Sequence, residues 1–386
     1  MQKLNILILY GSRSPEHEIS IITALQVMQN LNKEKYNLIP VYINKNGEWI
    51  LGNDTFLKPE VYKDLEELSA KHPKVTLGPN RILTSLGVFA KKIKVDFVLP
   101  VFHGAFGEDG TIQGLLESCF LPYSMSGVLA SALGLDKVIQ KQVFWSLGLP
   151  LVKYFSFNRN QWQKDQKEIL LKIKKLKSPW FVKPVCGGSS IGITKAKTEK
   201  GLTAAIEVAA FYDQRILVEE SVEKAREINI SVLGNTGSGL KVSVCEEPVS
   251  PAGVLTYKDK YQSSENKSSG MAGAKRVIPA KISKKTREKI EKLAKIAYEG
   301  LGCDGLARVD FLLSQDEKVL YINEINTIPG SLSFYLWEKS GIKFPELLDN
   351  LIALGVQKFE EKKKTNFTFQ TNILSSLDQK LGSKLK

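Results

Sequence analysis

The pattern of apolar and polar positions predicts a chain that begins with an open α/β domain. Residues 4–10 form a continuous apolar run, as expected of a parallel strand buried on both faces. A glycine turn follows, and apolar residues then recur at helical spacing from Ile21 to Leu31. Residues 36–43 and 95–101 are interpreted as further strands. Because ligands of such domains meet the carboxyl ends of the strands, the loops after these strands are the first candidates for a site.

Two of these loops carry candidate side chains. After the first strand, Glu18 is either a first-turn residue that complements the helix dipole or a carboxylate for a ligand ammonium group. The loop at residues 102–114 is rich in glycine, so its backbone amides can approach a ligand closely. Within this loop, His103 is either a ligand contact or a hydrogen-bonding residue that stabilises the loop.

A second pair of segments suggests a site for phosphate groups. The strand at residues 180–185 carries Lys183 and leads into a Gly-Gly-Ser-Ser turn at residues 187–190. A lysine charge beside turn amides forms an anion nest, although an ordinary β-hairpin loop fits the same residues. The spacing is not GxxxxGK[ST], which disfavours a P-loop NTPase. The long polar loop at residues 256–275 is typical of a functional or disordered segment, and a lid that excludes water fits it.

Two predicted strands that carry several polar side chains give the strongest indication of a site. Residues 306–312 and 320–326 flank a polar turn, so we expect a hairpin. Side chains two positions apart share a face of a strand, and pairing the strands gathers Arg308, Asp310, Glu324 and Asn326. Carboxylate and amide oxygens suit Mg²⁺, and an arginine suits a phosphoryl group or an oxyanion. The alternative is a sheet with one solvated face, but Asn and Asp are depleted in strands.

Composition narrows the class of protein. The 386 residues suggest two or three domains, and no apolar run approaches the roughly 20 residues that span a bilayer. The four cysteines are scattered without a CxxC pair, which favours a reducing cytoplasm over a disulfide framework or zinc site. The net charge of +13 comes from lysines that are spread among glutamates, so nucleic-acid binding is not expected. Part of the excess positive charge can attract an anionic substrate.

With these segments in order, the sequence resembles the D-alanine–D-alanine ligases of the ATP-grasp superfamily, from Leu4 to about residue 360. The motifs that carry the resemblance are Ser14-Pro15-Glu16-His17-Glu18-Ile19-Ser20, His103-Gly104 through Gly114, Ser126-Gly127-Val128 with Asp136-Lys137, Lys183-Pro184 with Gly188-Ser189-Ser190-Ile191-Gly192, Arg226-Glu227, Lys260-Tyr261, Arg308-Val309-Asp310 and Asn323 through Gly330. The resemblance implies an α/β N-terminal domain with an open parallel sheet, at residues 1–125. Two α+β ATP-grasp subdomains that clasp ATP would follow, at residues 126–215 and 216–361. The lid would lie at 256–275, and a basic tail at 362–386.

The resemblance also implies roles for individual residues. Those expected to bind ATP are Lys137, Lys183, the hinge residues Glu219, Glu220 and Val222, and Glu227 at the ribose. The expected ligands of two Mg²⁺ ions, which Mn²⁺ can replace, are Asp310, Glu324 and Asn326. Glu18 would hold the ammonium group of the first D-alanine, joined by the hydroxyls of Ser189 and Tyr261. Arg308 and the amide of Gly330 would stabilise the oxyanion, while His103 and Lys260 would contact substrate.

One departure from the family pattern concerns the second substrate. Family members commonly have a serine five residues after the glycine that corresponds to Gly330. In this sequence that position is Tyr335. Ser331, Ser333 or the Tyr335 hydroxyl could take over its role. We expect a cytoplasmic homodimer that joins two D-alanines for peptidoglycan precursors and inserts into no membrane. The alternative is an ATP-grasp ligase for another acceptor, such as D-lactate, D-serine or another amino acid, although Tyr261 favours an amine. A nucleic-acid-binding protein with a degenerate ATP fold is disfavoured because the metal-ligand residues are present.

Overall fold

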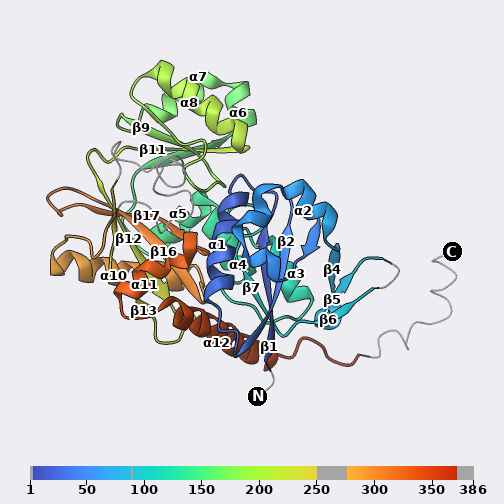
Figure 1. Cartoon of the computed structure of the whole chain (residues 1–386). Coiled ribbons are helices and arrows are strands. Elements are labelled where there is room, and N and C mark those ends of the chain that lie inside the picture. Colours follow the sequence, from blue (N-terminus) through green and yellow to red (C-terminus); the bar gives the residue numbers. More distant parts are fainter. Residues whose placement is uncertain (1–2, 88–89, 250–275, 372–386) are drawn as a thin grey trace.

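The computed structural model describes residues 3–87, 90–249 and 276–371. Within these residues the chain forms three four-stranded sheets and two smaller ones. Figure 1 shows a broad body that holds the first and third of the larger sheets, with a smaller lobe above it that contains α6, α7, α8, β9 and β11. The first sheet is mainly parallel and the other two are antiparallel. The predicted fold class, an open α/β domain followed by α+β parts, is therefore confirmed.

The first sheet has the strand order β3-β2-β1-β7, with β1 parallel to both β2 and β7. Residues 6–10 of β1 are completely buried, as the continuous apolar run predicts. A small three-stranded sheet, β4-β5-β6, lies in the same part of the chain. The elements are β1 (Leu4–Gly11), α1 (His17–Asn30), β2 (Tyr36–Ile43), β3 (Trp49–Leu51), η1 (Asp54–Leu57), η2 (Pro59–Lys63), α2 (Leu65–Lys71), β4 (Val75–Gly78), η3 (Pro79–Arg81), β5 (Ile82–Ser85), β6 (Lys92–Lys94), β7 (Phe97–Pro100) and α3 (Thr111–Ser118).

The second sheet forms the smaller lobe and has the order β10-β9-β11-β8. Apolar side chains of α6, α7 and α8 pack on it, and Trp162, Ile173 and Ile206 are almost completely buried there. Helices α4 and α5 are separated at Asp136, whose side chain accepts hydrogen bonds from the first turn of α5. The elements are α4 (Val128–Leu135), α5 (Lys137–Ser146), β8 (Tyr154–Asn158), α6 (Arg159–Lys164), α7 (Gln166–Ile173), β9 (Trp180–Pro184), β10 (Thr194–Ala196), α8 (Glu199–Tyr212) and β11 (Arg215–Glu220).

The third sheet, β13-β12-β16-β17, contains the predicted hairpin. Its apolar face packs on α10, an amphipathic helix whose Ile290, Ala294 and Ala297 are buried. The elements are β12 (Arg226–Leu233), β13 (Lys241–Val242), β14 (Glu247–Pro248), β15 (Arg276–Val277), α10 (Lys284–Gly300), β16 (Leu306–Leu313), β17 (Leu320–Asn326), η5 (Gly330–Ser333), α11 (Phe334–Lys339) and α12 (Phe344–Lys363).

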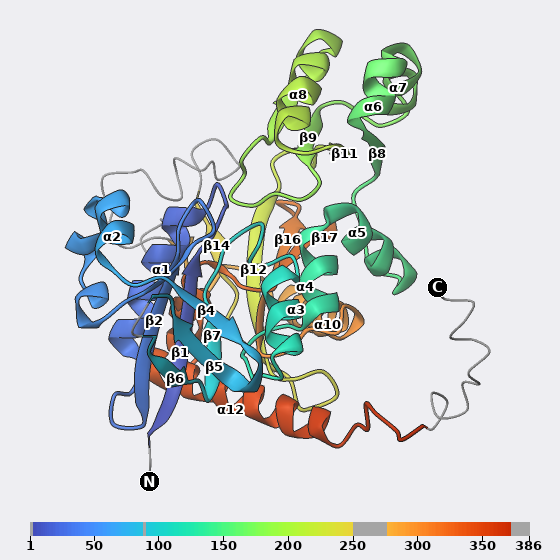
Figure 2. The ribbon, with the colours of Figure 1, turned by 90° about the vertical axis from the view of Figure 1, so that its right-hand side faces the viewer.

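Two elements do not follow the expected domain boundaries. Strand β11 pairs with β8 and β9, so it belongs to the second sheet although the expected boundary falls at residues 215/216. Helix α12 follows the third sheet in sequence, yet its Leu347 and Leu351 share a core with Ile8 of β1. Figure 2 shows α12 running beneath the first sheet. The end of the chain therefore ties the C-terminal part to the N-terminal domain.

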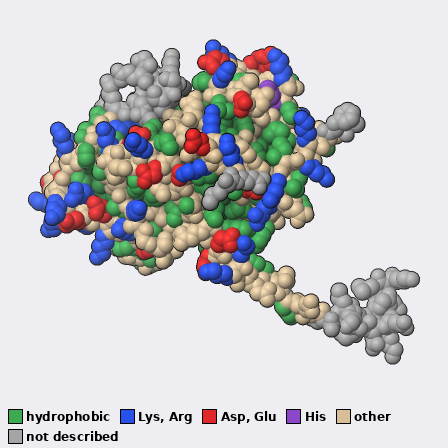
Figure 3. Space-filling model, turned by 60° about the horizontal axis from the view of Figure 1, so that its bottom comes forward, with side chains coloured by type: hydrophobic (Ala, Val, Ile, Leu, Met, Phe, Trp, Pro, Cys, Tyr) green, Lys and Arg blue, Asp and Glu red, His purple; other side chains and the backbone are tan. Residues whose placement is uncertain are grey.

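The surface carries its basic residues in a dispersed arrangement. On the face shown in Figure 3, lysine and arginine side chains are scattered among acidic, apolar and other residues. Several basic side chains of the described helices form exposed pairs with carboxylates one turn away, such as Lys172 with Glu168 and Arg287 with Glu291. In the described part of the chain, no helix combines the length and the apolar character that a membrane span requires.

Candidate active site

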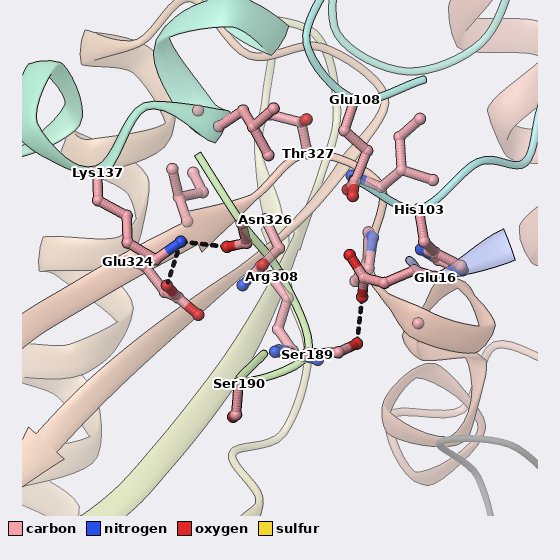
Figure 4. Close-up of a pocket in the computed structure, with 18 of the residues that line it drawn as sticks. Glu16, His103, Glu108, Lys137, Ser189, Ser190, Arg308, Glu324, Asn326 and Thr327 are labelled. Carbon is pink, nitrogen blue, oxygen red and sulfur yellow. Dashed lines mark hydrogen bonds and ion pairs between the residues drawn. The ribbon is translucent and has the colours of Figure 1, made fainter. Parts of the chain in front are cut away.

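A polar cavity of about 800 Å³, open to solvent, lies where the three larger parts of the chain meet. The N-terminal domain contributes Glu16, His103 and Glu108 to its wall (Figure 4). The smaller lobe and α5 contribute Lys137 and the turn at residues 187–190, and the third sheet contributes Arg308, Glu324 and residues 325–330. The cavity therefore gathers loops that follow the carboxyl ends of parallel strands together with the polar edge of the hairpin.

A register shift in the hairpin brings its polar side chains together: Phe311 pairs with Ile322, but the next residue, Asp310, pairs with Glu324 and not with Asn323. In the register of β16 and β17, Asp310 is opposite Glu324 and Arg308 is opposite Asn326. Arg308 binds Asp310 in a bidentate manner, with Nε–Oδ1 and Nη2–Oδ2 distances of 2.7 Å. Asn326 Nδ2 also donates to Asp310 Oδ2, at 3.1 Å. The predicted grouping of these four residues is confirmed, and Asp310 lies at its buried centre.

The carboxylates of this group repel one another. Burial raises the pKa of Asp310 to about 6 against the attraction of Arg308, and the carboxylates of Glu227 and Glu324 add to the rise. A bound cation would relieve this repulsion. Among the described residues, no three Asp, Glu, His or Cys side chains already form a metal site. Glu324 and Asn326 line the cavity, and Asp310 is buried behind them against Arg308. Two carboxylates and one amide are a set that fits Mg²⁺ with water and substrate oxygens as the remaining ligands.

Of the two lysines expected to bind phosphate, Lys137 lines the cavity and Lys183 does not. Lys137 is the first residue of α5; its Nζ is 3.9 Å from Glu324 Oε2 and donates to the carbonyl of Gly187. Lys183 on β9 and Lys141 on α5 flank the buried Glu219 of β11, at 2.5 and 2.6 Å. Burial alone would raise the pKa of Glu219, but the two ammonium groups lower it to about 2. The Glu219 side chain is therefore a counter-ion that fixes Lys183, and it does not line the cavity.

The carboxylate at the start of α1 differs from the expected one. Glu18 does not line the cavity: its side chain is 69% exposed and lies 3.9 Å from Lys45. Glu16, two residues earlier, is buried, lines the cavity and accepts a hydrogen bond from Ser189 Oγ (Figure 4). Residues two apart on a helix point in nearly opposite directions, so only one of them can face the cavity. The expectation that Glu18 faces the site is therefore contradicted, and Glu16 has that place.

A signal for Glu16 is present in the sequence. Positions 16, 20 and 23 are polar and follow helical spacing, and the structure buries all three. Positions 18, 22, 26 and 29 form the opposite face of α1, and each of them is at least partly exposed. An explicit comparison of the two faces would have favoured Glu16.

The glycine-rich loop after β7 contributes a histidine and a second carboxyl group. His103 is buried, and its Nε2 lies 2.9 Å from Thr23 Oγ1. Burial lowers the pKa of His103 to about 4, although a hydrogen bond to the backbone of Ile328 opposes this. Burial, and then the nearby Glu16 carboxylate, raise the pKa of Glu108 to about 8. Glu108 was missed in the sequence because an acidic residue in a polar loop gives no distinct signal.

The segment after Gly330 differs from the expected acceptor site. Gly330 borders the cavity, but Ser331, Ser333 and Tyr335 do not. The Tyr335 hydroxyl is 3.3 Å from Glu246 Oε1, and the Arg276 guanidinium stacks 4.0 Å from the Tyr335 ring centre. The Tyr335 hydroxyl therefore does not border the cavity, because its partners hold the ring elsewhere.

The remaining expected residues fall into two groups. Glu220, Val222 and Glu227 lie between β11 and the start of β12, at the junction of the second and third sheets, and none of them lines the cavity. Glu227 is close enough to Asp310 and Lys183 to raise the pKa of each. Lys260, Tyr261 and the whole of the expected lid, residues 256–275, lie outside the described residues.

The fold and the cavity together define the class of protein. Two antiparallel sheets meet at a cavity that is lined by Lys137, Arg308 and three glutamates, next to an open α/β domain. This is the arrangement of an ATP-grasp ligase, and the comparisons with known proteins agree. The profile described as "D-ala D-ala ligase N-terminus" matches residues 5–126, and "D-ala D-ala ligase C-terminus" matches residues 143–353. The chain belongs to the D-alanine–D-alanine ligase family.

Individual relatives match over nearly the full chain. The D-alanine–D-alanine ligase of Natranaerobius thermophilus is 39% identical over 375 residues, which cover 96% of this chain and 99% of that protein. The corresponding enzyme of Geobacillus kaustophilus is 38% identical, with 95% and 99% covered. Among solved structures, the D-alanine–D-alanine ligase of Coxiella burnetii has a TM-score of 0.79 at 31% identity, covering 94% and 97%. The VanG D-Ala:D-Ser ligase of Enterococcus faecalis has a TM-score of 0.77 at 33% identity, covering 92% and 100%.

Proposed function

We propose that this chain joins two D-alanines into D-alanyl-D-alanine with ATP, through a D-alanyl phosphate. A free carboxylate is a poor acylating agent, so transfer of the ATP γ-phosphoryl group must activate it first. The observation that carries the proposal is the convergence in one cavity of Glu16 and Ser189 with Lys137, Arg308 and Glu324. The first two suit an amino group, Lys137 and Arg308 suit phosphate and an oxyanion, and Glu324 suits the Mg²⁺ that would accompany the phosphates. Full-length similarity to D-alanine–D-alanine ligases supports the choice of substrate.

The first D-alanine would be held by Glu16. Its buried carboxylate is suited to an ammonium group because a charge-assisted hydrogen bond is strong away from water. Ser189 donates to Glu16 across the boundary between the N-terminal domain and the smaller lobe. Substrate binding at Glu16 would therefore involve both the N-terminal domain and the smaller lobe.

The phosphate groups of ATP would lie against Lys137, Lys183 and the turn at residues 187–190. The backbone of Glu220 and Val222 and the carboxylate of Glu227 are at the junction where adenine and ribose would bind. Asp310, Glu324 and Asn326 would hold Mg²⁺, which when bound neutralises negative charge on the phosphates and on the transferred group. Glu324 also lies beside Lys137, so the lysine and the carboxylate can order the same phosphate region.

The second D-alanine would attack the acyl phosphate as a free amine. A C–N bond forms, the C–O bond to phosphate breaks, and inorganic phosphate leaves with that oxygen. Arg308 and the Gly330 amide border the cavity and would stabilise the negative charge that develops on the carbonyl oxygen. Holding the amine beside the acyl phosphate makes the step effectively unimolecular. Exclusion of water from the site during the reaction would protect the intermediate from hydrolysis.

A different acceptor is the second candidate. Tyr335 is turned away from the cavity, and the VanG D-Ala:D-Ser ligase is among the similar solved structures. A competition assay separates the acceptors: ATP and D-alanine are incubated with equal amounts of D-serine or D-lactate, and the products are identified by mass. We expect D-alanyl-D-alanine to dominate. A main product that ends in D-serine or D-lactate would replace the first candidate with the second.

The cellular role follows from the reaction. We propose that the enzyme acts in the cytoplasm, where ATP is available, as a homodimer that supplies dipeptide to peptidoglycan synthesis and so to the cell wall and cell shape. The four cysteines are free thiols, three of them buried, which accords with a reducing compartment. Light scattering coupled to gel filtration tests the dimer, since a monomer would elute at 43.0 kDa.

A further inference from the structure

The turn that carries Gly330 has an unusual backbone. Three consecutive residues after it, Ser331, Leu332 and Ser333, have φ angles of 53°, 49° and 47°. Residues with a side chain adopt this left-handed region rarely and almost never in succession. Such a conformation persists only where its surroundings hold it in place. The identity of those surroundings therefore matters for the position of Gly330.

A threonine of α1 is hydrogen-bonded to this turn. Thr23 of α1 is buried, and its Oγ1 accepts a hydrogen bond from the backbone N–H of Ser331 at 3.3 Å. The same oxygen lies 2.9 Å from His103 Nε2. The side chain of Leu332, between the strained residues, is completely buried in the core that α1 shares with the first sheet. Contacts from the N-terminal domain thus hold a turn that belongs to the C-terminal part.

These hydrogen bonds form a connected chain. The Thr23 hydroxyl accepts from the N–H of Ser331 and shares a second hydrogen bond with His103 Nε2. A hydrogen bond to the backbone of Ile328 raises the pKa of His103, which is the effect of donation to a carbonyl. In the tautomer that donates to Ile328, Nε2 accepts from the Thr23 hydroxyl. One hydroxyl thus links His103 to the Ser331 amide.

The carboxyl group of Glu108 is hydrogen-bonded to the other side of the same turn. Glu108 Oε1 accepts from the N–H of Ile328 at 3.2 Å, and its Oε2 accepts from the N–H of Gly104 at 2.6 Å. Ile328 is thus bound at both its N–H and its carbonyl by the loop after β7. Since Ile328 and Ser331 flank Gly330, the backbone that borders the cavity is fixed on both sides by the N-terminal domain.

We propose that Thr23 is a positioning residue for the ligation step, which acts through His103 and Ser331 to hold the Gly330 amide at the cavity wall. This role rests on the proposed function, because it assumes that the Gly330 amide stabilises the oxyanion. A purely structural role is the competing explanation. The two differ in their kinetic consequences: a misplaced oxyanion donor lowers kcat in correctly folded enzyme, whereas a structural defect lowers the folded fraction.

The test compares Thr23→Val, which keeps the shape but removes the hydroxyl, with Thr23→Ser, which keeps the hydroxyl. Thr203→Val on α8 is a matched control, because the Thr203 hydroxyl bonds only the carbonyl one turn earlier, at an exposed site. Dipeptide formation is measured with the full chain, and kcat is normalised to the sites that bind ATP. For Thr23→Val we expect kcat to fall about 10- to 100-fold, as for a catalytic group displaced by about 1 Å. We expect an unchanged KM for ATP, and near-wild-type values for Thr23→Ser and Thr203→Val.

Each other outcome overturns the proposal. Wild-type kcat in Thr23→Val, an equal loss in Thr23→Ser, or a loss that disappears after normalisation would show that the hydroxyl does not position the turn. If Thr23→Val does not fold, Thr23→Ala provides the same comparison, with amide exchange of the peptide covering residues 328–333 as a second readout. Faster exchange there with lower kcat supports the proposal, and unchanged exchange contradicts it. Failure of the proposed function itself is distinguishable, since the wild-type protein would then form no dipeptide.

Discussion

At the scale of single residues, the site depends on which of two glutamates faces the cavity. Glu16 is buried against Ser189, and Glu18 is exposed near Lys45. We expect Glu16→Gln to lower kcat/KM for D-alanine by about 10- to 100-fold, because a hydrogen bond to a charged group is worth roughly 1.5–3 kcal/mol. Glu18→Gln is the matched control and should retain wild-type kinetics. If Glu18→Gln lowered kcat/KM in a steady-state assay and Glu16→Gln did not, the role would belong to Glu18.

A second residue-scale prediction concerns Glu324, which lies opposite Asp310. Glu324→Gln removes one of the two carboxylates that would hold Mg²⁺, and we expect ADP release to fall by about 100- to 1000-fold, as when an electrostatic stabiliser is lost. Glu338→Gln, at an exposed position of α11, is the control. Circular dichroism should show the same fold for both variants. Turnover of Glu324→Gln at the wild-type rate would exclude the metal role.

A third prediction links Glu219 to stability. Its pKa is lowered to about 2 by Lys141 and Lys183, so the folded state favours the carboxylate. Its contribution is therefore complete above the ordinary pKa of about 4.5 and is lost as the pH falls toward 2. Glu219→Gln leaves two buried ammonium groups unpaired, which costs about 3–5 kcal/mol. Urea unfolding at pH 7 and pH 3.5 should show that the difference between wild type and variant shrinks at low pH, and a constant difference would contradict this assignment.

At the scale of elements, the turn between β9 and β10 brings the smaller lobe to Glu16. Gly188 leaves no room for a side chain, because a Cβ there would overlap the Glu16 carboxylate, whereas a Cβ at Gly187 would meet Pro184 at an ordinary 3.7 Å. We expect Gly188→Ala to displace Glu16 and raise KM for D-alanine about tenfold or more, a loss of at least ~1.4 kcal/mol in binding. Gly187→Ala should behave as wild type. Equal kinetics in the two variants would show that this contact does not shape the substrate site.

The pattern of residues within single strands and turns predicts part of the site. Alternation within each strand correctly places Arg308 with Asp310 and Glu324 with Asn326. The pairing that unites the two sets also needs the register shift between Asp310 and Phe311, which the two-residue period and the turn do not predict. The turn beside Gly188 is likewise recognisable from its glycines and serines. Tyr335 could not be placed in this way, since its partners Glu246 and Arg276 are distant in sequence and their convergence depends on tertiary packing.

At the scale of the whole molecule, the cavity exists only where three parts of the chain meet. Thr23 and Ser331 are 308 residues apart, and Ser189 and Glu16 are 173 apart, so no local pattern reveals either contact. Helix α12 reinforces this assembly by packing beneath the first sheet (Figure 2). The fold class was predictable because each sheet has its own local pattern. The packing of one part on another was not, because it is determined by side chains that meet only after folding.

The most direct test of the account follows the oxygen atoms of D-alanine. The enzyme is incubated with ATP, Mg²⁺ and D-alanine that carries ¹⁸O in its carboxylate, and both products are analysed by mass. If a D-alanyl phosphate forms, one carboxylate oxygen leaves with phosphate. The account therefore predicts one ¹⁸O in each inorganic phosphate, with one D-alanyl-D-alanine formed per ADP. Unlabelled phosphate, or ADP release without dipeptide, would contradict it.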